Sequence, residues 1–150
     1  MSSPSQFAVS VKGVVLDPQR RVLLLRNERD EWELPGGRIE IGETPEECVA
    51  REIAEETRWT VTTGPVLDTW MYHIDQVDRH VFVVTYGCHP VSAGAPVLSH
   101  EHREVGLVPR SEVAGLRMPD GYRRSIDTWF DRIGAATVPR GTAGRGGDSS

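Results

Sequence analysis

Apolar residues recur with two different periods along this chain of 150 residues. Runs rich in β-branched and aromatic residues, partly alternating with polar ones, are typical of strands. They predict strands at residues 7–17, 21–27, 59–74, 80–88 and 105–109. The short turn at residues 18–20 joins the first two strands, and this predicts a hairpin.

The first helical signal is a capping box. Thr44 fits the N-cap and Pro45 the first helical position. Glu47 fits the third helical position, from which its side chain can reach back to the N-cap. A helix should therefore begin at Pro45 and end at about Thr57.

Two further helices are expected after the last strand. Ser111 can cap a short helix at residues 111–116, and apolar residues at helical spacing predict an amphipathic helix at residues 121–136. The segment from Thr137 onward has nothing to bury, so a disordered tail is predicted at residues 137–150.

The order of elements is strands, helix, strands, helix, with loops at residues 29–37 and 89–104. This order predicts an α/β fold, with a mixed β-sheet flanked by helices in a single domain over residues 1–136.

Composition narrows the classes of function. The net charge of −5 argues against broad binding to a nucleic-acid backbone, although a small phosphorylated ligand can bind through a divalent cation. There is no long apolar run and no secretory signal pattern, so neither membrane spanning nor secretion is expected. Cys48 and Cys88 form no CxxC pair, and a reducing cytoplasmic location is the simplest expectation.

The predicted helix at residues 45–57 carries an unusual density of glutamates. Glu52, Glu55 and Glu56 are three and four residues apart, so they share one helical face. Arg51 can pair with Glu47 or Glu55, but no comparable cation serves all three carboxylates. Two interpretations fit this spacing equally well: a solvated acidic face, or a set of oxygen ligands for a hard divalent cation.

The residues around the glutamates resemble the Nudix box of the Nudix hydrolases, G-x5-E-x7-R-E-U-x-E-E-x-G-U, where U is a bulky aliphatic residue. The matching residues are Gly37, Glu43, Arg51, Glu52, Ile53, Glu55 and Glu56. Arg58 stands where the family has its second glycine, and Trp59 replaces an aliphatic residue. The preceding WELPGG stretch is also typical of the family, and the resemblance implies a Nudix-like α/β/α sandwich.

The resemblance implies a hydrolase that cleaves the pyrophosphate linkage of a nucleoside diphosphate derivative with Mg²⁺ or Mn²⁺. Nucleoside diphosphate sugars, (d)NTPs and dinucleoside polyphosphates all remain open as substrates. The implied metal ligands are Glu52, Glu55 and Glu56, with a backbone carbonyl at Gly36 or its neighbour as a further ligand. Arg51 would orient a box glutamate, and Glu43 would have a supporting role.

The general base is expected in the box or in the loop at residues 89–104. Glu104 is favoured over Glu101 because it lies closer to the next strand, and Glu52 is the candidate if neither loop acid acts. His100 and His102 are expected at the surface or at the edge of the substrate rather than in a zinc site.

The expected substrate contacts lie outside the glutamate helix. Arg26 is a candidate for phosphate, Arg38 for a further substrate contact, and Trp32 is the best candidate for stacking on a base.

A second class of function is a non-catalytic Nudix-fold sensor that binds a nucleotide. The intact carboxylates favour the enzyme, and the absence of a cysteine before the box disfavours an isoprenoid diphosphate isomerase. The expected partner is a small nucleotide, with no nucleic acid and no membrane; a homodimer is left open.

Overall fold

The computed structural model describes residues 6–91 and 94–148, with side chains described as far as residue 135. The strands are β1 (Ala8–Val15), β2 (Arg21–Arg26), β3 (Trp32–Glu33), β4 (Gly36–Arg38), β5 (Val61–Ile74), β6 (Arg79–Pro90) and β7 (Glu104–Pro109). They form two sheets, one in the order β4-β1-β6-β5 and the other in the order β3-β2-β7. The helical elements are α1 (Pro45–Thr57), the 3-10 turn η1 (Asp75–Val77), α2 (Arg110–Val113) and α3 (Asp120–Asp148).

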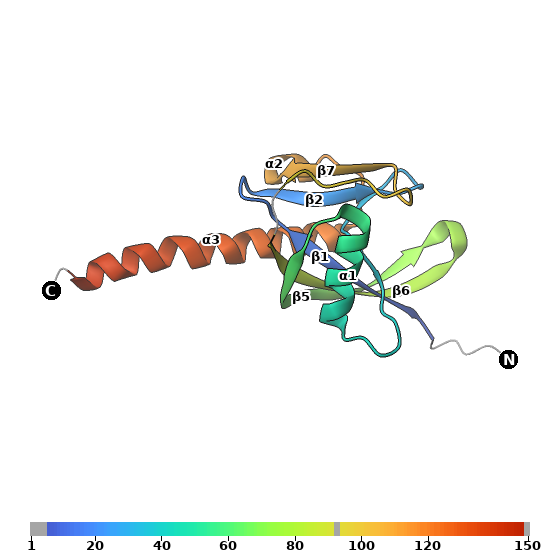
Figure 1. Cartoon of the computed structure of the whole chain (residues 1–150), viewed down its shortest axis with the longest axis horizontal. Helices are drawn as coiled ribbons and strands as arrows, with labels where there is room; N and C mark the ends of the chain where they lie inside the picture. The colour runs from blue at the N-terminus through green and yellow to red at the C-terminus, as the bar shows by residue number, and fades with distance from the viewer. Residues whose placement is uncertain (1–5, 92–93, 149–150) are drawn as a thin grey trace.

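The four-stranded sheet has a helix on each face (Figure 1). It is mixed, because β1 runs parallel to β6 while β4 and β5 are antiparallel to their neighbours. Along β1, Val11 and Val15 pack with α1, whereas Val14 packs with α3 on the opposite side. This alternation is what a strand between two apolar layers requires. The predicted α/β/α sandwich in a single domain is confirmed.

The predicted hairpin of the first two strands is confirmed only at its turn. Arg20 N–H donates to the Asp17 carbonyl, Asp17 N–H donates to the Arg21 carbonyl, and Leu16 and Val22 form an antiparallel bridge. Beyond that bridge β2 pairs with β3 and β7 instead of β1. All four apolar residues of β2, from Val22 to Leu25, are fully buried. Because both faces of β2 are apolar, it lies between core layers rather than continuing the sheet of β1.

The predicted loop at residues 29–37 contains β3 and β4. These strands have two and three residues, too few for a period of two to be visible in the sequence. The short helix α2 begins at Arg110 with Pro109 at its N-cap, so Ser111 lies inside the helix and does not cap it. The existence of β3 and β4 and the first residue of α2 both depend on which backbone groups form hydrogen bonds. Residue propensities do not specify these hydrogen bonds.

α3 is longer than the predicted amphipathic helix, and its apolar residues Tyr122, Ile126, Trp129 and Phe130 pack on the core. The disordered tail predicted at residues 137–150 falls outside the residues whose side chains are described, and it stays a prediction. Within the described chain, no helix is both long enough and apolar enough to cross a membrane.

Both ends of α1 are fixed by backbone chemistry. The capping box is present as predicted: Glu47 N–H donates to Thr44 Oγ1 at 3.1 Å, and Thr44 N–H donates to Glu47 Oε1 at 2.9 Å. At the other end Arg58 is left-handed, with φ 65°, and its N–H donates to the Ala54 carbonyl. The helix therefore ends with the geometry that glycine normally supplies, but with an arginine in that position.

Replacing Arg58 by glycine should stabilise the fold by up to about 1 kcal/mol, because glycine adopts positive φ without a steric cost. Arg58→Ala is the matched control, since it removes the same side chain but keeps the Cβ atom that causes the strain. Thermal unfolding of both variants without metal checks the prediction. Equal melting temperatures for the two variants would contradict it.

Candidate active site

The three glutamates of the predicted acidic face of α1 differ greatly in exposure. The Glu55 side chain is 59% exposed and that of Glu52 is 19% exposed, whereas Glu56 is only 6% exposed. A face that carried only solvated charge would expose all three, because an ionised carboxylate loses hydration energy on burial. The exposure of the three carboxylates instead decreases from Glu55 through Glu52 to Glu56, so the group extends from the surface into the interior.

Glu56 lies where α1 packs against β4 and β1. Its Oε1 accepts a hydrogen bond from the Gly36 N–H at 2.9 Å, and the buried Lys12 is close enough to act on its charge. Burial is the larger effect and raises the pKa of Glu56 to about 7, while Lys12 and the Gly36 N–H act to lower it. A cation bound beside this carboxylate would favour its charged form.

Two glycines allow β4 to approach the glutamates. Gly36 has φ 146°, and a Cβ atom there would overlap the carbonyl oxygen of Val11. A Cβ atom at Gly37 would lie 2.5 Å from the carboxyl carbon of Glu52. A larger residue at Gly36 would push β4 away from β1, and one at Gly37 would displace the carboxylate of Glu52, so the two glycines let β4 lie close to both elements. Burial also raises the pKa of Glu52.

Arg51 is the cation within this cluster. It donates from Nε and Nη2 to the two oxygens of Glu43, at 2.9 and 2.8 Å. Its Nη1 donates to Glu52 at 3.2 Å and to Glu55 at 3.3 Å. The hydrogen bonds from Arg51 lower the pKa of Glu43 to about 2. Arg51 therefore lies where it can orient the Nudix-box glutamates. Glu47, the other predicted partner of Arg51, is engaged in the capping box of α1 instead.

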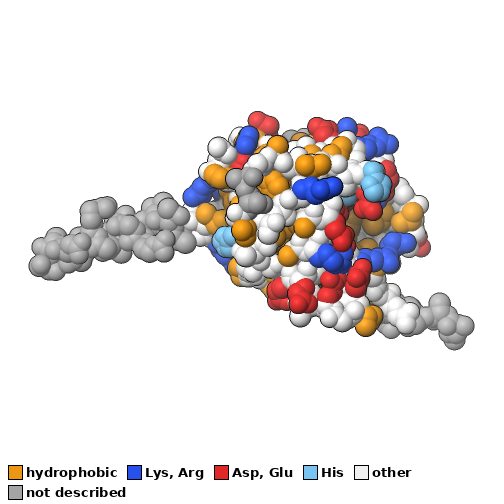
Figure 2. Space-filling model, viewed as in Figure 1, with side chains coloured by type: hydrophobic (Ala, Val, Ile, Leu, Met, Phe, Trp, Pro, Cys, Tyr) orange, Lys and Arg blue, Asp and Glu red, His pale blue; other side chains and the backbone are white. Residues whose placement is uncertain are grey.

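Acidic and basic side chains gather over the face of the molecule on which α1 lies (Figure 2). A cavity of about 430 Å³ opens near the C-terminal end of that helix. Its lining joins Glu55, Glu56 and Arg58 to the loop at residues 97–101, including Glu101. The fold thus brings a loop carboxylate to the same cavity as two helix carboxylates.

The predicted loop base Glu104 lies elsewhere. Its Oε1 is 3.2 Å from Nε of Arg26, and it is not part of the lining of the cavity beside α1. Arg26 also pairs with Asp30 at 2.6 Å. Because two carboxylates engage Arg26, this arginine is not presented to that cavity as a free phosphate ligand.

A smaller cavity of about 160 Å³ collects positive charge. Its charged and aromatic lining residues are Lys12, Arg29, Glu33, Arg38, Arg79, Tyr72 and Tyr122. Arg38, predicted to contact substrate, is among them. Trp32 is not; it packs against the core next to Gly106. The aromatic side chains that line this cavity are Tyr72 and Tyr122, and stacking on Trp32 stays a prediction. We refer to this space as the cation-lined cavity.

The comparisons with known proteins agree with this geometry. The model of the NUDIX domain matches residues 6–130. The chain belongs to the NUDIX family. It is 37% identical over 122 residues to a MutT-like protein of Streptomyces ambofaciens, covering 81% of this chain and 75% of that protein. The predicted enzyme class, a Nudix pyrophosphohydrolase, is confirmed at this level.

Two further similarities place the chain within the family. An 8-oxo-dGTP diphosphatase of Proteus vulgaris is 37% identical over 82 residues, which is 49% of this chain and 71% of that protein. The crystal structure of a MutT protein from Methanosarcina mazei Go1 superposes with a TM-score of 0.72 at 26% identity, covering 89% of this chain and 99% of that one. The predicted Nudix fold is thus found in a solved relative.

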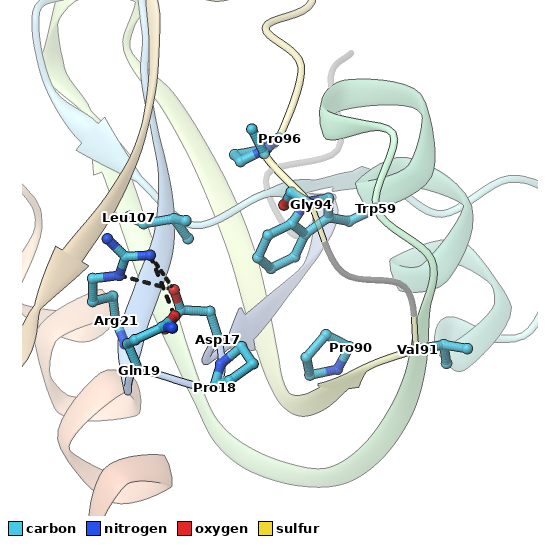
Figure 3. Close-up of a pocket in the computed structure, with 11 residues that line it drawn as sticks. Asp17, Pro18, Gln19, Arg21, Trp59, Pro90, Val91, Gly94, Pro96 and Leu107 are labelled. Atoms are coloured by element: carbon cyan, nitrogen blue, oxygen red, sulfur yellow. Dashed lines mark hydrogen bonds and ion pairs between the residues drawn. The ribbon is translucent and has the colours of Figure 1, made fainter.

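Trp59, the second departure from the Nudix box, is part of the core. It is buried against the α1 side of the sheet, and its Nε1–H donates to the Gly94 carbonyl at 3.1 Å. Its ring lines an apolar cavity of about 580 Å³ whose wall includes the Asp17–Arg21 ion pair (Figure 3). This cavity is larger than the one beside α1, but none of the Nudix-box glutamates lines it. Cavity size alone therefore does not locate the chemistry.

A buried histidine–glutamate pair was not predicted. The His102 side chain, expected at the surface, is 8% exposed, and its Nε2 is 3.0 Å from Oε2 of Glu33. Burial acts to lower the pKa of His102, but the hydrogen bond to Glu33 and the charge of Glu56 raise it overall. The pair links the loop before β7 to β3. One hint of this pair is visible in the sequence: Glu33 is a charged residue between the apolar Trp32 and Leu34. β3 is too short for an alternating pattern to show which side chains are buried.

Glu56→Gln should change how stability depends on pH in the absence of metal. The folded-state pKa of Glu56 is raised, so its contribution to stability is complete below the unfolded value near 4.5 and is lost as the pH rises through about 7. The variant should therefore match the parent near pH 4.5 and be more stable by about 1–3 kcal/mol at pH 8. Urea unfolding across this range measures the difference.

Glu46→Gln is the control for this experiment, because Glu46 is an exposed glutamate of the same helix. It should leave the pH dependence of the parent unchanged. A Glu56→Gln curve parallel to that of the parent would show that Glu56 does not titrate in this window.

Proposed function

We propose that this Nudix protein is a Mg²⁺- or Mn²⁺-dependent pyrophosphohydrolase whose substrate is a nucleoside triphosphate. The observation that carries the proposal is the burial of Glu56 beside the more exposed Glu52 and Glu55, with Arg51 as the cation of the cluster. Burying one of three neighbouring carboxylates costs hydration energy that a purely solvated acidic face would not lose. The burial suits a site in which the ligand brings positive charge with it.

The donor set fits a hard divalent cation. Glu52, Glu55 and Glu56 offer only carboxylate oxygens, which are the ligands that Mg²⁺ and Mn²⁺ prefer. These three residues would hold the ion, with a backbone carbonyl at Gly36 as a further candidate. When bound, the ion supplies neutralisation of the charge on the phosphate oxygens. Arg51 keeps Glu52 and Glu55 in place through Nη1 while Glu43 holds its other nitrogens.

The structure favours Glu101 over Glu104 as the general base. Glu101 shares its cavity with Glu55 and Glu56, whereas Glu104 is paired with Arg26. A base must reach the attacking water, directly or through one further water. Glu101 would accept a proton from that water. The water oxygen would then form a bond to phosphorus while the bond from that phosphorus to the bridging oxygen of the pyrophosphate breaks.

The cation-lined cavity supports a phosphorylated, aromatic ligand. Arg38 and Arg79 offer guanidinium groups, which bind phosphate oxygens well because of their planar, multiple N–H donors. Arg29, which also lines the cavity, is paired with Glu28 and Glu31 at 3.6 and 3.7 Å. Tyr72 offers a ring face for a base. These residues come from separate strands and loops on one side of the four-stranded sheet.

The choice of a nucleoside triphosphate rests on relatives. Several similar proteins are named 8-oxo-dGTP diphosphatases, among them those of Proteus vulgaris and Escherichia coli. Relatives named ADP-ribose pyrophosphatase also match, over 82 and 54 residues. A nucleoside diphosphate sugar is thus the second candidate. The box carboxylates are all present, which favours the enzyme over the non-catalytic sensor. A cytoplasmic location and a homodimer stay predictions.

Chelation tests the role of the metal. EDTA should abolish hydrolysis of 8-oxo-dGTP, dGTP and ADP-ribose alike, and excess Mg²⁺ should restore it, because the charge on the phosphates is otherwise not neutralised. Glu55→Gln should lower kcat at least about a hundredfold, the scale of losing a major electrostatic contribution. Steady-state assays with resolved products measure both effects and rank the substrates.

Glu46→Gln is again the matched control and should retain activity, because Glu46 lies on the same helix outside the box positions. Full turnover in excess chelator would refute the metal mechanism. Hydrolysis of ADP-ribose alone would move the substrate to the second candidate without affecting the metal.

Glu101→Gln and Glu104→Gln should separate the two loop acids. We expect the first to lower kcat by about 10²–10⁴-fold with KM within a few-fold, and the second to have a much smaller effect. A larger effect at Glu104 would reverse the assignment, and no effect at either residue would make Glu52 the candidate.

A further inference from the structure

The tip of the β5–β6 hairpin carries chemistry that the proposed active site does not use. Residues 73–80 read H-I-D-Q-V-D-R-H, with a histidine at each end and two aspartates placed symmetrically between them. η1 and the left-handed Asp78, with φ 48°, form the turn that brings the two ends together. The turn thus gathers these two histidines and two aspartates into one cluster at the surface.

The two histidines face each other across the hairpin. His73 and His80 are cross-strand partners, and their rings stack with centroids 4.4 Å apart and planes 9° from parallel. Oδ1 of Asp78 lies 2.9 Å from Nε2 of His73. One ligand atom from each of these three residues lies within 4.8 Å of the other two.

Asp75 completes the arrangement from the other side of the ring. Its Oδ1 is 3.0 Å from Nδ1 of His73. Histidines that bind metal commonly donate their second ring N–H to a carboxylate, which fixes the tautomer and the ring orientation. The carboxylate of Asp78 accepts in the 2.9 Å contact with Nε2 of His73, so an ion bound at Nε2 would take the place of the proton shared there, while Nδ1 stays beside Asp75.

We propose that His73, Asp78 and His80 bind a late first-row divalent ion of the Zn²⁺ class, with Asp75 orienting His73. Tetrahedral bonds of roughly 2.0–2.1 Å place ligand atoms about 3.3 Å apart. The stacked rings of His73 and His80 would have to rotate so that both direct a nitrogen lone pair at one ion, and both side chains are exposed. Two imidazoles and one carboxylate select Zn²⁺, Co²⁺, Ni²⁺ or Cu²⁺ over Mg²⁺. The inference does not depend on the proposed function, because the hairpin tip shares no residue with the Nudix-box glutamates. Those glutamates offer only oxygen ligands.

An ion at this position would connect the ends of β5 and β6. The same hairpin contributes Ile74 and Arg79 to the lining of the cation-lined cavity. Fixing the hairpin therefore fixes one wall of that cavity.

Zn²⁺ titration of the EDTA-stripped full chain tests the proposal. Calorimetry is run with Mg²⁺ in large excess, so that oxygen-only sites are occupied by Mg²⁺. We expect one Zn²⁺ per chain, with affinity at least about tenfold lower in His73→Ala and in His80→Ala, because a lost imidazole removes one of three ligands. Asp75→Asn should weaken binding less, since it removes only the orienting contact.

His89→Ala is the matched control: His89 is an exposed histidine of β6 away from the hairpin tip, and its variant should bind as the parent does. Co²⁺ in place of Zn²⁺ should give visible absorption bands that are lost in the His80 variant. Circular dichroism confirms that each variant is folded. The absence of saturable Zn²⁺ binding in the parent, or unchanged binding in both the His73 and His80 variants, overturns the proposal.

Discussion

The position of one buried carboxylate, Glu56, constrains the rest of the site. The Gly36 N–H donates to it, the charge of Lys12 acts on it, and burial raises its pKa to about 7. Any shift of α1 along β4 would break this hydrogen bond and leave the buried carboxylate without its N–H donor, which disfavours its charged form further. The register of helix on strand and the chemistry of the site are therefore set by the same contact.

Lys12 connects the acidic and the basic halves of the molecule. Burial acts to lower its pKa, but the charges of Glu33 and of the helix glutamates raise it overall, so it stays charged in the interior. It lines the cation-lined cavity on one side and acts on Glu56 on the other. The proposed ligand, a phosphate with a divalent cation, would place its cation beside the α1 glutamates and its phosphate oxygens beside the cation-lined cavity.

The departures from the Nudix box are accommodated by packing outside the carboxylates. Arg58 adopts the left-handed conformation expected of glycine, and its backbone still closes the helix on Ala54. Trp59 fills the core and hydrogen-bonds to the loop at Gly94. Neither change alters the helical spacing of Glu52, Glu55 and Glu56, because both follow the end of α1.

The sequence by itself determined whatever depends on local spacing. The capping box placed the start of α1, and the three- and four-residue intervals placed Glu52, Glu55 and Glu56 on one face, since helical geometry is the same wherever the helix lies. Only the tertiary structure decided which carboxylate is buried, because burial depends on β4 and β1, more than 15 residues away. It also brought Glu101 rather than Glu104 to the cavity beside α1 and buried His102 against Glu33. The predicted pairing of β1 with β2 stops at the turn for the same reason. A strand that is apolar on both faces can join either sheet, and β7, the partner that pairs along the whole of β2, is far along the chain.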